Sequence, residues 1–218
     1  MDSKTLVRVL TILKKESAGW NVPIVTLVAQ RSADPYQVLI STLISLRTKD
    51  EVTTLASLKL FKLADTPKSM IRLKAGEIRK AIYPAGFYKR KAETILRVSR
   101  ILLEQHAGRV PGGLDELLAL PGVGRKTANL VLTLGFGKPG ICVDTHVHRI
   151  TNRLGYVRTK SPDETEMVLR GKLPKAWWIP INDILVAFGQ GLCKPVSPWC
   201  TRCPVSKWCE RIGVTHSR

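Results

Sequence analysis

The chain has 218 residues, and 44% of them are hydrophobic, so it can bury a substantial core as one large domain or two small lobes. It carries 35 Lys and Arg against 17 Asp and Glu, which gives a net charge of +18. This excess goes beyond what solubility requires and predicts a polyanionic partner, with nucleic acid favoured over a membrane surface. No apolar run approaches the roughly 18 residues of a membrane-spanning helix, and no signal-peptide pattern is present. We therefore expect an intracellular protein with reduced thiols and no membrane partner.

Apolar residues recur at helical spacing along almost the whole chain, while alternation with a period of two is nearly absent. The sequence therefore predicts an all-α fold. Asp34-Pro35 has the form of an N-cap followed by the first residue of a helix. Five residues fall on one stripe of that helix: Val38, Leu39, Thr42, Leu43 and Leu46. A second helix is expected after Lys49-Asp50, and it contains Val52, Leu55, Leu58 and Leu63.

Three more helices are expected between residues 78 and 120. Ile78 to Ile82 mark the third helix, which breaks near Pro84 and Gly86. The fourth runs from about residue 90 to 106, and its inward side consists of Ile95, Val98, Ile101 and Leu102. A Pro-Gly-Gly loop at 111–113 then separates it from a short helix at 114–120.

Residues 120–128 read LPGVGRKTA, which predicts a helix, a tight glycine turn and a second helix. Gly122 and Gly124 allow a sharp reversal and leave the backbone amides at the start of the second helix pointing outward. Such amides can hold a phosphate of a nucleic-acid backbone, although a purely structural hairpin would give the same pattern.

Lys126 lies in the first turn of that second helix, where the helix dipole disfavours a cation. A partly desolvated amine at such a place is a usable nucleophile, and a solvated lysine is the alternative reading. Asp144 lies at or just before the predicted N-terminus of a later helix. The alternative to a chemical role for Asp144 is that it simply caps this helix.

Four cysteines near the C-terminus can together surround one metal centre: Cys193, Cys200, Cys203 and Cys209. Only the middle two form the tight pair that is typical of structural zinc sites, and the spacing matches none of the common iron–sulfur patterns. Spacing alone favours a metal centre, zinc or iron–sulfur, over disulfides or free thiols. Cys142 lies in an apolar run and is expected to be packed core.

Several of these segments together resemble the endonuclease III family of helix-hairpin-helix DNA glycosylases. They are LPGVGRKTA at 120–128, VDTHVHR at 143–149, GFYKRKA at 86–92 and the Cys-x6-Cys-x2-Cys-x5-Cys ending. The resemblance extends from about residue 30 to residue 210 and implies two helical lobes with a DNA-binding cleft between them. One lobe is a six-helix module at 28–138 that contains the helix-hairpin-helix at about 114–136. The other combines 1–27 with 139–218 and holds an iron–sulfur loop at 193–209.

The resemblance also implies a function, a base-excision repair enzyme that removes oxidised pyrimidines from duplex DNA and nicks the strand at the abasic site. It makes Lys126 the Schiff-base nucleophile and Asp144 the catalytic carboxylate, while the four cysteines near the C-terminus ligate one [4Fe-4S] cluster. The residues expected to contact DNA in the hairpin are Gly122, Gly124, Arg125 and Thr127. The expected partner is double-stranded DNA with a damaged pyrimidine or an abasic site, bound by a monomer, in the cytoplasm or nucleoid if the source is prokaryotic.

Two positions depart from the family pattern. Arg47 stands where family members place a glutamine that fills the gap left by the flipped base, and Phe87 stands where a leucine is common. An arginine donates two parallel hydrogen bonds to guanine, so we expect a preference for lesions opposite guanine. Phe87 is a candidate wedge between bases, with core packing as its alternative role.

Two other functions stay open. A relative of the same superfamily could remove mismatched thymine or uracil, or adenine, and Lys126 weighs against this reading. A non-catalytic DNA-binding protein could use the hairpin and the basic surface alone, and the pair Lys126 and Asp144 weighs against that one.

Overall fold

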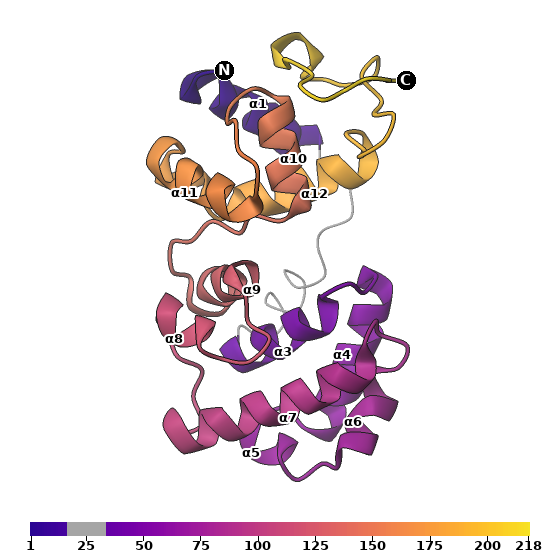
Figure 1. Ribbon diagram of the computed structural model, residues 1–218, viewed down its shortest axis with the longest axis vertical. Helices are drawn as coiled ribbons and strands as arrows, with labels where there is room; N and C mark the ends of the chain where they lie inside the picture. The colour runs from indigo at the N-terminus through magenta and orange to yellow at the C-terminus, as the bar shows by residue number, and fades with distance from the viewer. Residues whose placement is uncertain (17–33) are drawn as a thin grey trace. The chain divides into compact units, whose positions relative to one another are not determined.

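A computed structural model describes residues 1–16 and 34–218 of the chain (Figure 1). The described residues form helices and turns and contain no strand, which confirms the predicted all-α fold. The chain divides into two compact units, with one division at Lys138 and Pro139. The other division, like the expected boundary between residues 27 and 28, lies outside the described residues.

One unit contains the middle of the chain. Its helices are α3 (Pro35–Ser45), α4 (Asp50–Leu63), α5 (Pro67–Met70), α6 (Ala75–Ile82), α7 (Tyr88–Gln105), α8 (Leu114–Leu118) and α9 (Arg125–Leu130), which continues as the π-helix η2 (Val131–Gly135). We refer to it as the hairpin unit. The other unit contains α1 (Ser3–Glu16), α10 (Thr145–Arg153), α11 (Pro162–Lys172) and α12 (Pro180–Gly191), with short 3-10 turns at Lys175–Trp177 and Ser206–Trp208. We refer to it as the cysteine unit.

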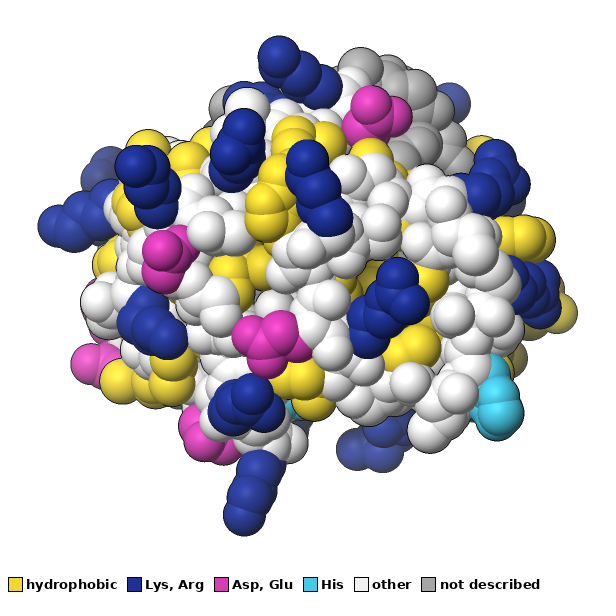
Figure 2. All heavy atoms as spheres, turned by 90° about the horizontal axis from the view of Figure 1, so that it is seen from above, with side chains coloured by type: hydrophobic (Ala, Val, Ile, Leu, Met, Phe, Trp, Pro, Cys, Tyr) yellow, Lys and Arg dark blue, Asp and Glu magenta, His cyan; other side chains and the backbone are white. Residues whose placement is uncertain are grey.

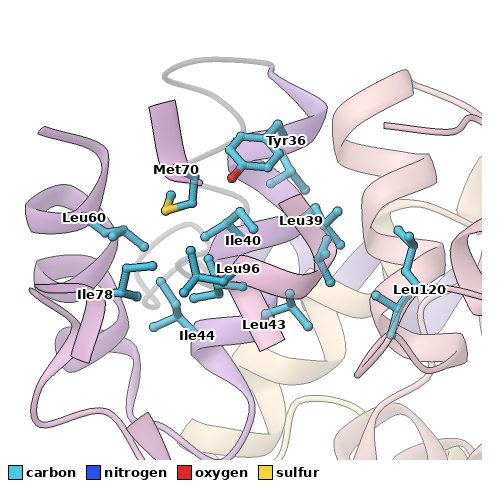
Figure 3. Close-up of a cluster of buried hydrophobic side chains, with 14 of the residues drawn as sticks. Tyr36, Leu39, Ile40, Leu43, Ile44, Leu60, Met70, Ile78, Leu96 and Leu120 are labelled. Atoms are coloured by element: carbon cyan, nitrogen blue, oxygen red, sulfur yellow. The ribbon is translucent and has the colours of Figure 1, made fainter. Parts of the chain in front are cut away.

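Helix α3 lies at the centre of the hairpin unit. It packs against α4, α7, α9 and η2, and most of its side chains are buried. Figure 3 shows Leu39, Ile40, Leu43 and Ile44 of this helix among apolar side chains of the neighbouring elements. The side chain of Asp34 accepts a hydrogen bond from the amide of Tyr36, so the predicted N-cap is confirmed.

Helix α4 forms where the sequence predicts it but faces differently. Its buried residues are Thr53, Ala56, Ser57 and Leu60. Leu55 and Leu63 are 59% and 56% exposed, so these leucines do not form the packed side of the helix. Small residues let α4 approach α3 and α6 closely, which explains why the leucines are displaced outward.

Helix α7 confirms the predicted long helix, starting two residues earlier at Tyr88. Ile95, Val98 and Leu102 are fully buried, and Ile101 packs partly buried against the same core. The helix contacts α3, α5 and α6, and Lys91 in its first turn donates hydrogen bonds at the end of α3. Arg47 follows the end of α3 and Phe87 precedes α7, so both candidate site residues lie at this meeting point.

The cysteine unit is built on the contacts of α12 with α10 and α1. Its core includes Leu6, Val147, Leu185 and the aromatic rings of Tyr156 and Phe188. Cys142 is 3% exposed, which confirms its predicted burial. Figure 2 shows many basic and few acidic side chains on the face it presents, in line with the net charge of +18. No described helix is both long and apolar enough to cross a membrane.

Candidate functional site

The predicted helix-hairpin-helix is present as α8, a glycine turn and α9. Gly122 has a φ of +78°, and a Cβ at this position would lie 3.0 Å from Cγ2 of Thr94. Glycine is required here because an L side chain is disfavoured at positive φ and would also meet α7. Gly124 has a φ of −96° and acts as the N-cap of α9, and an added Cβ would meet nothing within 4 Å. The first glycine therefore serves the fold, whereas the second leaves open space at the start of α9.

The start of α9 presents backbone and basic groups to its surroundings. Gly124 has no side chain, and within the described residues no side chain caps this helix. Lys126 is exposed and Arg125 is half-buried, whereas the next residues turn inward. Thr127 is 2% exposed, so its side chain packs within the unit and offers almost no surface to a ligand.

Asp144 is the N-cap of α10. Its Oδ1 atom accepts hydrogen bonds from the amides of His146, at 2.8 Å, and Val147, at 2.9 Å. These two contacts hold the carboxylate in one orientation at the positive end of the helix dipole. The predicted capping role is thus confirmed, and with 9% exposure the side chain lies at the edge of the buried core.

Arg47 and Phe87 come together in the hairpin unit, although 40 positions separate them in the sequence. The guanidinium carbon of Arg47 lies 5.6 Å from the ring centroid of Phe87. Both residues have positive φ, 53° and 57°, which is uncommon for side chains of this size. Phe87 is 57% exposed, so the structure does not support core packing as its role. Sequence motifs alone give no sign of this contact.

The four cysteines of the C-terminal motif, Cys193, Cys200, Cys203 and Cys209, line one pocket in the cysteine unit. Apolar side chains complete its wall, among them Ile150, Leu154, Phe188 and Val205. Burial raises the pKa of the Cys203 thiol to about 11, and the neighbouring cysteines add to the rise. Four thiolates would repel one another in such surroundings, so a positively charged group is needed to stabilise them as ligands. Among the described residues no set of three His, Cys, Asp or Glu side chains is arranged to hold a single metal ion.

Arg153 is a buried residue that sequence reasoning missed. At 7% exposure, its guanidinium donates hydrogen bonds to the carbonyl oxygens of Lys194 and Pro195, both at 2.6 Å, and lies 3.5 Å from Sγ of Cys193. Arg149, one turn earlier in α10, donates to the carbonyl oxygen of Cys193 at 2.9 Å. Two arginines of one helix therefore hold the backbone around the first cysteine. Arg149 ends the VDTHVHR segment at 143–149, whereas no sequence signal distinguishes Arg153 among 35 basic residues.

Lys91 is a second residue that sequence reasoning missed. It lies in α7, is 8% exposed and donates hydrogen bonds to the carbonyl oxygens of Ile44 and Leu46 and to Oγ1 of Thr48. Burial lowers its pKa to about 8. Lys91 belongs to the GFYKRKA segment at 86–92, but three basic residues in a row give no sign of which one is buried.

The structure places the predicted residues in two separate groups. Lys126, the hairpin glycines, Arg47 and Phe87 belong to the hairpin unit, whereas Asp144 and the four cysteines belong to the cysteine unit. The joint action of Lys126 and Asp144, which belong to different units, stays a prediction.

Comparison with known proteins shows which family the chain is similar to. The family model for HhH-GPD superfamily base excision DNA repair proteins matches residues 40–175. Endonuclease III from Thermotoga maritima is 53% identical over 173 residues, which cover 79% of this chain and 81% of that protein. The solved structure of a trapped endonuclease III–DNA covalent intermediate has a TM-score of 0.86 and 32% identity, and the match covers 97% of each chain. A thermostable thymine-DNA glycosylase has a TM-score of 0.82 and 27% identity, with 95% of this chain and 96% of that chain covered.

Proposed function

The chain belongs to the endonuclease III family within the HhH-GPD superfamily of base excision DNA repair proteins, and we propose which of its residues carry the reaction and on which lesion. It is a DNA glycosylase and abasic-site lyase, and it binds DNA. The lesions we propose are oxidised pyrimidines in duplex DNA, bound by a monomer. The extrusion of a damaged base costs less than that of an intact, well-stacked one, which contributes to selectivity.

Lys126 is the proposed nucleophile, and one observation carries this assignment. The side chain is exposed in the first turn of α9, directly after a glycine turn that no described side chain caps, while its neighbours Thr127 and Ala128 are buried. The amine of Lys126 attacks C1′ of the extruded nucleotide, and the glycosidic bond breaks with its electron pair leaving on the base. The sugar ring then opens to a Schiff base on Nζ.

Asp144 from the other unit is the proposed carboxylate of the same reaction. The two amides that bind Oδ1 fix its orientation, so the carboxylate need not reorganise when positive charge develops on the sugar. It stabilises that charge or accepts the proton that the attacking amine releases. The Schiff base then acidifies the hydrogen at C2′, and loss of that proton expels the 3′ phosphate by β-elimination.

The hairpin supplies the proposed grip on the DNA backbone. The open space at Gly124 lets a phosphate approach the start of α9, and Arg125 adds a charge beside it. Gly122 contributes through the turn geometry. Arg47 and Phe87 are the proposed residues that fill the space left by the extruded nucleotide.

A [4Fe-4S] cluster is the group we propose for the four cysteines. Such a cluster takes one thiolate at each of its four irons, so the four cysteines would supply its complete ligand set. Their thiols line one apolar pocket, which supports a shared group. The group would supply covalent cross-links to a segment that has few apolar residues of its own, and we assign it no step of the reaction.

The test is borohydride trapping on a duplex that contains one thymine glycol. The native chain should give a covalent adduct, and Lys126→Ala should give none, while Lys62→Ala, at an exposed lysine of the same unit, should be trapped like the native chain. Base release without trapping would contradict the nucleophile assignment. A duplex with a guanine–thymine mismatch serves as the second arm, because the likeness to a thymine-DNA glycosylase favours that substrate as the alternative.

A further inference from the structure

The end of α3 and the start of α7 meet around one buried ammonium group. Lys91 donates to the carbonyl oxygen of Ile44 at 2.5 Å, to that of Leu46 at 2.6 Å and to Oγ1 of Thr48 at 2.8 Å. An ammonium has three N–H donors, so these three contacts use its full capacity. None of the three partners is a carboxylate. The contacts therefore stabilise the charge of Lys91 through backbone and hydroxyl dipoles alone.

Two of these acceptors are terminal carbonyls of a helix. Helix α3 ends at Ser45, and Leu46 is its C-cap residue. The last carbonyls of a helix lack intrahelical partners and carry the negative end of the dipole, so a cation is favourable there. Lys91 thus caps α3 from another helix and determines the direction in which the chain leaves it.

The residue that follows this cap is Arg47, whose backbone has a φ of 53°. Its carbonyl oxygen approaches Gly86 so closely that a Cβ at Gly86 would overlap it. The amide of Gly86 donates to Oγ1 of Thr48 at 3.1 Å, the same oxygen that accepts from Lys91. One hydroxyl therefore joins the buried ammonium, the segment with Arg47 and the residue before Phe87.

Arg47 and Phe87 are thus two exposed side chains on strained backbone, held from inside by one network. Their guanidinium and ring lie 5.6 Å apart. Backbone held at positive φ by its surroundings is typical of sites where a side chain must point in one direction. Loss of the ammonium would leave the buried carbonyl of Ile44 without its donor and the carbonyl of Leu46 with only the 3.4 Å contact from the Thr48 hydroxyl, and it would release that constraint.

We propose that Lys91 is a positioning residue that sets how Arg47 and Phe87 together fill the space left by an extruded nucleotide. This inference rests on the gap-filling role proposed above for these two side chains. Lys91 itself touches neither DNA nor the reacting atoms. Its effect must therefore appear where a gap has to be filled, and not in the chemistry of Lys126.

The experiment compares an abasic site in a duplex with the same site in a single strand. Only the duplex leaves an opposite base without a partner, so gap filling contributes to the duplex reaction alone. The rate of borohydride-trapped adduct is measured on both substrates for the native chain and for Lys91→Met. Lys80→Met, at an exposed lysine of the same unit, is the control for loss of one positive charge.

In Lys91→Met the ratio of the duplex rate to the single-strand rate should fall about tenfold, equivalent to ~1.4 kcal/mol, while Lys80→Met leaves it unchanged. Thr48→Ala removes one acceptor and the link to Gly86, so it should lower the same ratio by a smaller factor. Thr48→Ala also tests the proposal if Lys91→Met does not fold. An unchanged ratio in a folded variant, or an equal fall on both substrates, would overturn the proposal. A native chain that is trapped on neither substrate would instead refute the proposed function.

Discussion

Oδ1 of Asp144 lies 2.8 Å from the backbone nitrogen of His146, so the proposed catalytic carboxylate is also the N-cap of α10. The same oxygen accepts from Val147 at 2.9 Å. Asp144 thus serves both as the cap of α10 and as the proposed catalytic group, and an alanine substitution would disturb both roles. Asparagine caps a helix about as well as aspartate but carries no charge, so it separates the two roles.

Asp144→Asn should therefore keep the stability of the native chain and lose activity. We expect a fall of about 10²–10³ in the single-turnover rate of base release, in the range found when a charge-stabilising group is removed. Asp144→Ala should lose activity and about 1 kcal/mol of stability as well. Thermal denaturation and base release from a thymine glycol duplex measure the two effects. Full activity of the Asp144→Asn variant would show that Asp144 acts only as a helix cap.

The two hairpin glycines should respond differently to the same substitution. Gly122→Ala places a side chain at a φ of +78° and against Thr94, so we expect a loss of about 1–2 kcal/mol of stability. Gly124→Ala meets nothing within 4 Å at ordinary φ, and because alanine is a poorer N-cap than glycine it should cost about 0.5–1 kcal/mol of stability, less than Gly122→Ala. It should nevertheless weaken DNA binding, because its methyl group occupies the space where a phosphate approaches. Unchanged binding of undamaged duplex by Gly124→Ala, at several salt concentrations, would argue against a backbone contact at this turn.

The sequence carries the local signals of this fold but not its long-range contacts. Asp34-Pro35 predicts a helix start because a cap and the residue after it are neighbours in the chain. The exposed leucines of α4 show the limit of this reasoning, since helical spacing reveals a helix but not which side the neighbouring helices cover. Lys91 and Arg153 show it again, because a buried cation is identified only by carbonyl groups more than 40 positions away. The cysteine motif was readable because its four members are close together in the sequence.

Arg153 should be essential to the cysteine loop. Arg153→Leu keeps the apolar stem but leaves the carbonyls of Lys194 and Pro195 without their donor, which we expect to cost about 3 kcal/mol. The proposed cluster should then be lost faster in air or in the presence of a chelator, which its visible absorbance would record. Arg158→Leu is the matched control, because that side chain is 75% exposed and its ion pair with Glu210 lies at the surface. Equal rates of cluster loss in both variants would show that the hydrogen bonds of Arg153 do not support the ligand loop.

Arg47 should determine which base is tolerated opposite the lesion. Its guanidinium can donate to two acceptors of guanine, and this pair contributes about 1–3 kcal/mol of discrimination. In Arg47→Gln we expect the preference for thymine glycol opposite guanine over adenine to fall about tenfold. Lys49→Gln, two residues further on and exposed, controls for the loss of charge. A native chain that processes both pairs at equal rates would remove the basis for this preference.

The buried ammonium of Lys91 should make stability depend on pH in an alkaline window. Burial lowers its pKa from 10.5 to about 8 in the folded chain. Between these two values the unfolded chain binds more protons at this group than the folded chain, so Lys91 makes the free energy of unfolding rise with pH. The physical reason is that the cost of burying a charge disappears as the folded state releases its proton.

Other groups titrate in the same range, so the difference between the native chain and Lys91→Met isolates this contribution. We expect the native chain to gain stability relative to the variant as pH rises from about 8 towards 10.5, and to show no such gain below about 8. Denaturant unfolding at constant ionic strength measures it. A difference that stays flat across the window would mean that the three hydrogen bonds of Lys91 fully offset its desolvation. A difference that falls would mean that they more than offset it and hold its pKa above the ordinary value.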